Sequence, residues 1–75
     1  MLNNQQLLDK LEEYKQRFHE ECRKGEWNAA KLIHYEAMVV SRIILGSDRA
    51  EEYLLGFEQT FVKRAYHVDD DMEGE

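Results

Sequence analysis

The chain has 75 residues, of which 16 are acidic and 10 are basic, for a formal net charge of −6. This length is about half the usual allowance for one domain, so a second domain is excluded. The acidic balance argues against a protein that holds nucleic acid on a generally basic surface. Apolar residues make up 43% of the chain, which is enough for a hydrophobic core and too much for a wholly disordered chain.

The sequence favours a cytoplasmic protein. No segment approaches the ~20 apolar residues that are needed to span a bilayer. Met1 is followed by Leu-Asn-Asn-Gln-Gln, without the basic and apolar regions of a signal peptide. The single cysteine, Cys22, cannot form an internal disulfide, and this is typical of proteins in a reducing compartment.

A first helix is predicted from about Asn4 to Lys24. Its apolar residues recur at the helical spacing and form one stripe, made of Leu7, Leu8, Leu11, Tyr14, Phe18 and Cys22. Asn3 or Asn4 can cap the first turn. Gly25 follows at the position where helices commonly end in a left-handed conformation.

A second helix, predicted from about Glu26 to Leu45, is apolar almost all round. One stripe comprises Ala30, Ile33, Ala37, Val40 or Ser41, and Ile44. Another comprises Leu32, Tyr35 or Glu36, Val39, and Ile43. A helix that is apolar on two faces has to be covered on two sides.

A third helix is predicted from Asp48 to His67, with Asp48 as its N-cap and Glu51 completing a capping box. Gly46 separates it from the second helix, and Gly56 lies inside it. Its stripe is Ala50, Leu54, Phe57, Phe61 and Ala65, flanked by Tyr53 and Val62. The remaining residues, 68–75, carry five acids and no base and are expected to form a disordered acidic tail.

These elements predict an all-α fold, in which an antiparallel helical hairpin and a third helix form a three-helix bundle with a single domain over residues 1–67. The second and third helices carry more apolar surface than the covering stripes use. We therefore expect a helical homodimer, in which the second helix, or the face that joins it to the third, meets its copy. The alternative is a monomer with the second helix at its centre.

Residues 25–37 read Gly-Glu-Trp-Asn-Ala-Ala-Lys-Leu-Ile-His-Tyr-Glu-Ala and resemble the turn and second helix of a tetratricopeptide (TPR) unit. Gly25, Trp27, Ala30 and Ala37 stand at the offsets where that family places a glycine, an aromatic residue and small residues. The resemblance implies an αα-hairpin that binds a peptide or a protein. No proline ends the second helix, and no second repeat follows.

Few residues point to chemistry. His19 and Cys22 lie three residues apart on the first helix, and antiparallel packing could bring His34 near them to hold zinc. The paired spacing of a four-ligand zinc site is missing, so a buried thiol beside two ordinary histidines is the simpler interpretation. Neither a glycine-rich phosphate loop nor a desolvated carboxylate pair is visible, and no enzyme, cofactor or metal is predicted.

We predict a small non-enzymatic helical protein, an adaptor or regulatory subunit that acts through protein–protein contacts and associates with itself. The alternatives are a nucleic-acid-associated regulator and a small metal-binding protein. No membrane or small-molecule partner is evident. Aromatic and methionine side chains are enriched at the cores of interfaces. The candidate contact residues are therefore Trp27, Tyr35, Met38, Val39, Ile43, Tyr53 and Phe57.

Overall fold

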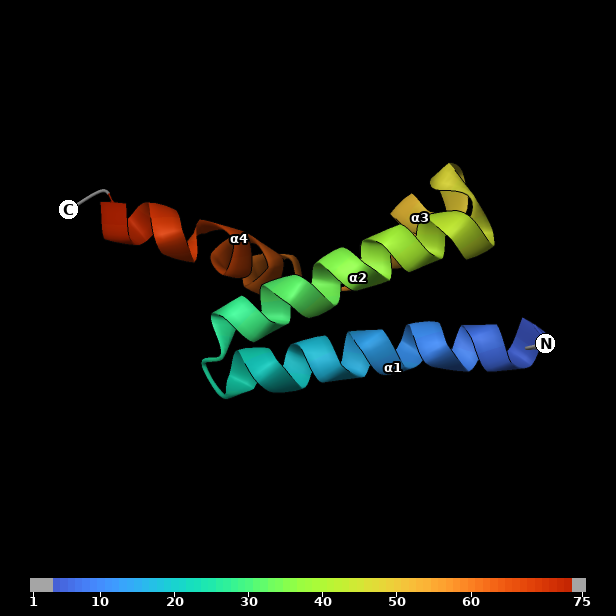
Figure 1. Cartoon of the computed structure of the whole chain (residues 1–75), viewed down its shortest axis with the longest axis horizontal. Helices are drawn as coiled ribbons and strands as arrows, with labels where there is room; N and C mark the ends of the chain where they lie inside the picture. Colours follow the sequence, from blue (N-terminus) through green and yellow to red (C-terminus); the bar gives the residue numbers. More distant parts are fainter. Residues whose placement is uncertain (1–3, 74–75) are drawn as a thin grey trace.

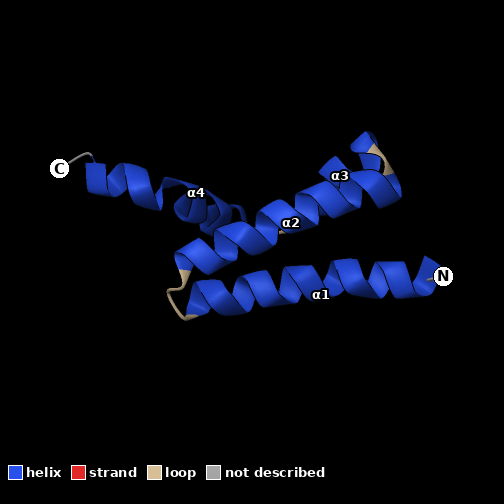
Figure 2. Ribbon diagram, viewed as in Figure 1, coloured by secondary structure: helices blue, strands red, loops and turns tan. Residues whose placement is uncertain are grey.

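The described part of the chain forms four α-helices, and Figure 2 shows the short turns that join them. The computed structural model describes residues 4–73, with side chains as far as residue 67. The helices are α1 (Asn4–Arg23), α2 (Trp27–Leu45), α3 (Ser47–Leu54) and α4 (Gln59–Glu73). No strand occurs among these described residues, and the predicted all-α class is confirmed.

The other helices assemble around α2. In Figure 1, α1 and α2 lie side by side as an antiparallel hairpin, α3 turns back at the end of α2, and α4 runs behind α2 toward the α1–α2 turn. α2 packs against α1, α3 and α4, whereas α1 and α4 touch each other much less. The molecule is elongated, at 48 × 24 × 18 Å. One side of α2 has no neighbour among the described helices.

The turn between α1 and α2 forms at Gly25, which has a φ of 79°. The Gly25 N–H donates to the Cys22 carbonyl at 3.0 Å, and the Glu26 N–H donates to the Glu21 carbonyl at 2.9 Å. These two bonds form a Schellman motif, whose left-handed residue is usually glycine because a Cβ would strain it. The predicted helix end at Gly25 is confirmed.

The hairpin buries one stripe from each of its helices. On α1 these residues are Leu11, Tyr14, Phe18 and Cys22, all members of the predicted stripe. On α2 they are Ala30, His34, Ala37 and Ser41, three of which have small side chains. Small side chains let neighbouring helices approach closely, and the large side chains of α1 fill the space over the α2 backbone.

The prediction of one continuous third helix is wrong, because the segment forms two helices separated by residues 55–58. The Gly56 N–H donates to the Tyr53 carbonyl at 3.0 Å and closes the end of α3. A Cβ at position 56 would lie 3.0 Å from Lys15 Nζ and 3.1 Å from the Tyr53 carbonyl oxygen. The Lys15 ammonium ends a flexible side chain and can move away, whereas the Tyr53 carbonyl is fixed backbone, so the carbonyl favours glycine at this corner.

Because of the break, α3 and α4 can pack on α2 in two different directions. Ala50 of α3 and Ala65 of α4 are both fully buried, and Phe57 between the two helices is only 1% exposed. The turn at residues 55–58 changes the direction of the chain and inserts the Phe57 ring into the core.

The predicted Asp48–Glu51 capping box does not form. α3 begins at Ser47 with Gly46 in the N-cap position, and no side chain makes a capping bond. A single residue joins α2 to α3, so Asp48 already lies in the first turn, where its charge is favourable for the helix dipole.

At the other end of the chain, α4 continues as a helix through residues 68–73, where the sequence predicts a disordered tail. The side chains of this stretch and residues 74–75 lie outside the described part, so the acidic tail stays a prediction.

Candidate functional site

An apolar stripe of α2 is exposed. It consists of Leu32, Tyr35, Val39 and Ile43, whose exposed fractions are 68%, 56%, 41% and 79%. Spacings of three and four residues place these side chains on one face of the helix. At 100° per residue this face lies about 180° from the buried stripe of α2. The helix is therefore apolar on two opposite sides, and the other described helices cover only one of them.

Charged side chains border the exposed stripe of α2. At 100° per residue Lys31 and Arg42 lie within about 20° of each other on one edge, and Glu36 lies on the other. The Tyr14 hydroxyl of α1 donates to Glu36 Oε1 at 2.9 Å, so the acidic edge is the one that faces α1. Burial, together with the Glu36 carboxylate, raises the pKa of Tyr14, which keeps the hydroxyl protonated as the donor.

The predicted contact residues divide between the surface and the core. Tyr35, Val39 and Ile43 lie on the exposed stripe, and Met38 is partly buried on the same helix. Phe57 belongs to the core, with 1% of its surface exposed, so its assignment as a contact residue is corrected. The reason is the break between α3 and α4, which the sequence interpretation did not include.

Trp27 and Tyr53 are partly buried and attach the C-terminal half of the chain to the hairpin. The Trp27 ring packs edge-to-face on Phe61, with 6.0 Å between ring centroids, and the Arg64 guanidinium lies 5.5 Å from the Trp27 ring centroid. The Tyr53 hydroxyl donates to the backbone carbonyl of Leu11. These contacts give both aromatic side chains a structural role.

Leu32 is an exposed residue that the list of candidates missed. It belongs to the second predicted stripe of the α2 segment, so the periodicity already placed it beside Val39 and Ile43. Leu8 and Leu55 are also exposed, at 49% and 69%, but they lie on α1 and in the α3–α4 connection.

The two histidines considered as metal ligands contact Phe57 instead. His19 Nε2 accepts a hydrogen bond from the Glu58 N–H at 2.9 Å, and its ring lies 6.1 Å from the Phe57 ring. His34 Nδ1 lies 2.7 Å from the Tyr66 hydroxyl, and its ring lies 5.1 Å from that of Phe57. Within the described residues, no group of three or more His, Cys, Asp or Glu side chains could hold a metal ion.

Burial lowers the pKa of His19, and nearby Arg23 adds to this effect, while the Glu58 carboxylate opposes it. Burial also lowers the pKa of His34. His19 can accept the Glu58 N–H only while Nε2 is unprotonated, so neutral imidazole is the form that this fold requires.

We expect the free energy of unfolding to fall as the pH is lowered below about 6.5, the ordinary histidine pKa. The unfolded chain takes up protons there, whereas His19 and His34 do so only at lower pH, because their folded-state pKa values are depressed. The contribution of the two histidines to the free energy of unfolding is fully present above their unfolded-state pKa. It is lost as the pH falls through their folded-state pKa values.

Urea midpoints at about pH 7.5, 6.5 and 5.5 measure this decline across the ordinary histidine pKa. His19→Gln keeps an acceptor for the Glu58 N–H and removes one titrating group, so its midpoint should decline less steeply. A wild-type midpoint that stays constant over the range would contradict the expectation.

Cys22 is buried at 4% exposure, and burial raises the pKa of its thiol to about 11. A reactive cysteine needs a lowered pKa, since the thiolate is the nucleophile. Cys22 therefore behaves as a small apolar side chain of the core.

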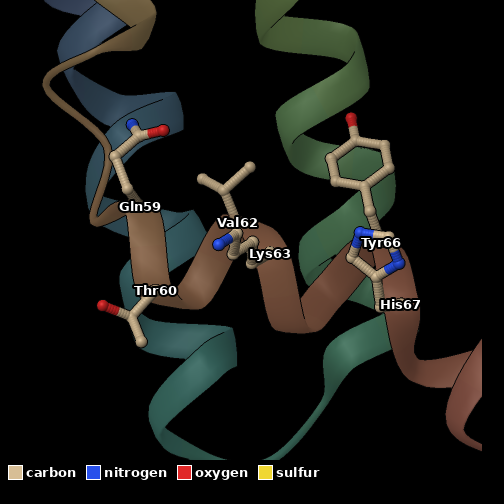
Figure 3. Close-up of a pocket in the computed structure, with 6 residues that line it drawn as sticks. All are labelled: Gln59, Thr60, Val62, Lys63, Tyr66 and His67. Carbon is tan, nitrogen blue, oxygen red and sulfur yellow. The ribbon is translucent and has the colours of Figure 1, made fainter.

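A hollow of about 430 Å³ lies along α4, and Figure 3 shows the residues that line it. It is lined by Gln59, Thr60, Val62, Lys63, Tyr66 and His67. Because all six belong to one helix, the hollow is a surface groove rather than an enclosed site. The Tyr66 ring is 37% exposed, and its hydroxyl contact with His34 ties α4 to α2.

Among the described helices, none combines the length and the apolar character required to traverse a bilayer. Comparisons with known protein families, with curated proteins and with solved structures find no match to this chain. The likeness of residues 25–37 to a tetratricopeptide unit therefore remains a local resemblance.

Proposed function

We propose that this chain acts through protein–protein contacts, as a small non-enzymatic adaptor or regulatory subunit that associates with itself through the exposed stripe of α2. The observation that carries the proposal is the exposure of Leu32, Tyr35, Val39 and Ile43 directly opposite the buried face of the same helix. Contiguous apolar patches on soluble proteins commonly mark interaction sites.

The hydrophobic effect supplies the driving force for covering this stripe. Burying a large aliphatic or aromatic side chain that was exposed is worth about 1.5–3 kcal/mol. Leu32 and Ile43 are more than two-thirds exposed and have the most to gain. Part of this gain offsets the freedom lost on association, so the expected contact is concentration-dependent rather than permanent.

A nucleic-acid-associated role has less support in the geometry. Two basic side chains lie near carboxylates of their own helix: Lys24 lies 3.6 Å from Glu20 and 3.2 Å from Glu21, and Lys15 lies 3.5 Å from Glu12. Mixed charges of this kind are typical of solvated helix faces. We therefore place protein contact ahead of the nucleic-acid and metal-binding alternatives.

Ile43→Glu is expected to shift the chain from dimer to monomer, because it replaces the most exposed apolar side chain of the stripe with a charge. Light scattering over a concentration series measures the mass, with 9.0 kDa for a monomer and twice that for a dimer. Leu55→Glu is the matched control, because Leu55 is also exposed, at 69%, but lies outside α2. A wild-type mass of 9.0 kDa at every concentration would contradict the proposed self-association.

A further inference from the structure

We infer that the second copy binds in a parallel orientation, with the two α2 helices side by side around a two-fold axis that runs along them. This inference rests on the proposed self-association and specifies its geometry. Two observations support it: the distribution of charge on the two edges of the exposed stripe, and the order of apolar residues within it.

The two edges carry opposite charges at a spacing that suits parallel helices. Lys31 lies on one edge and Glu36 on the other, about 140° apart at 100° per residue. In a parallel pair each edge faces the opposite edge of the partner, and residues five positions apart meet across the contact. Lys31 of each copy would therefore lie near Glu36 of the other, which makes two ion pairs by symmetry.

An antiparallel pair would bring like charges together. In that orientation each edge faces the same edge of the partner, so Lys31 would lie near Arg42 of the second copy and the two Glu36 carboxylates would share the other edge. Like charges that face one another weaken association, whereas opposite charges fix the orientation of paired helices. The charge distribution thus favours the parallel arrangement over the antiparallel one.

The apolar residues agree with the parallel arrangement. Leu32, Tyr35 and Val39 are spaced by three and then four residues, as in the seam of paired helices, and a two-fold axis along α2 would set each against its own copy. The aliphatic stems of Lys31 and Arg42 would extend the covered area at the edge of the stripe.

Cysteine cross-linking tests the orientation. In a Cys22→Ala background, Leu32→Cys and Val39→Cys are expected to form covalent homodimers, each on its own, under mild oxidation. In an antiparallel pair these two positions exchange places, about 10 Å apart along the helix at 1.5 Å per residue. That separation exceeds the ~4.4–6.8 Å between Cα atoms that a disulfide spans, so only a mixture of the two variants could cross-link.

A charge substitution provides a second test. Lys31→Glu replaces both attractive pairs of the parallel dimer with repulsive ones and is expected to weaken association about tenfold. In an antiparallel dimer the same substitution would face Arg42 and strengthen association. Arg49→Glu, a matched change of charge at an exposed position of α3, is expected to leave the dissociation constant within about twofold.

The outcomes separate this inference from the function on which it rests. A dimeric mass together with cross-linking of each single variant supports the parallel pair. A dimeric mass without homodimer cross-links, or a tighter Lys31→Glu dimer, overturns the parallel orientation and leaves self-association standing. A monomeric mass for the wild-type chain overturns both.

Discussion

Phe57→Ala is expected to destabilise the fold by about 3–5 kcal/mol, the usual cost of removing a buried aromatic ring. The Phe57 ring is 1% exposed and packs edge-to-face on Phe18, His34 and Tyr53, with centroid distances of 5.1, 5.1 and 5.5 Å. It therefore joins α1, α2 and α3 at one point. A small domain has a net stability of about 5–15 kcal/mol, so this loss leaves little of the fold.

The measurement is urea or thermal unfolding followed by far-ultraviolet circular dichroism. Leu55→Ala is the control, because it truncates a large side chain two residues earlier in the same connection, where 69% of the side chain is exposed. The control should change the stability by less than about 0.5 kcal/mol. A Phe57→Ala protein as stable as the control would show that the ring does not anchor the connection.

Ala37→Leu is expected to destabilise the protein by about 1–3 kcal/mol through overpacking. Ala37 is fully buried in the α2 stripe, where a small side chain permits close helix approach. A leucine there must push neighbouring side chains out of their preferred rotamers or move a helix away from α2.

The matched variant is Glu52→Leu, which places the same leucine side chain at an exposed position of α3, outside the exposed stripe of α2. Its stability should stay near that of the wild type, while Ala37→Leu unfolds at lower urea concentration. Equal urea midpoints for both variants would mean that the buried stripe of α2 can hold a larger side chain. That result would contradict the close packing described for the hairpin.

Much of the fold could be predicted from local features of the chain. The apolar spacing of α1 identified Leu11, Tyr14 and Phe18 as one face, and all three are buried. The glycine at position 25 identified the end of α1. Both signals are local, because helical periodicity and a left-handed terminal residue depend on neighbours within a few positions along the chain.

The candidate site could be predicted only in part. Periodicity placed Leu32, Val39 and Ile43 on one stripe of the second helix, and it placed Ala30 and Ala37 on another. It did not say which stripe the rest of the chain would cover, since both are apolar. The structure buries the stripe with the smaller side chains, where α1, α3 and α4 can approach α2 most closely.

The amino-acid sequence was sufficient for the helical class, the hairpin and the two apolar faces of α2, because these depend on short-range spacing. The break between α3 and α4 and the burial of Phe57 needed the folded chain. A phenylalanine in a continuous helical stripe and one that enters the core from a turn have the same local pattern. The difference arises from packing against α1 and α2, where the Phe57 ring meets Phe18 and His34 and His19 accepts the Glu58 N–H.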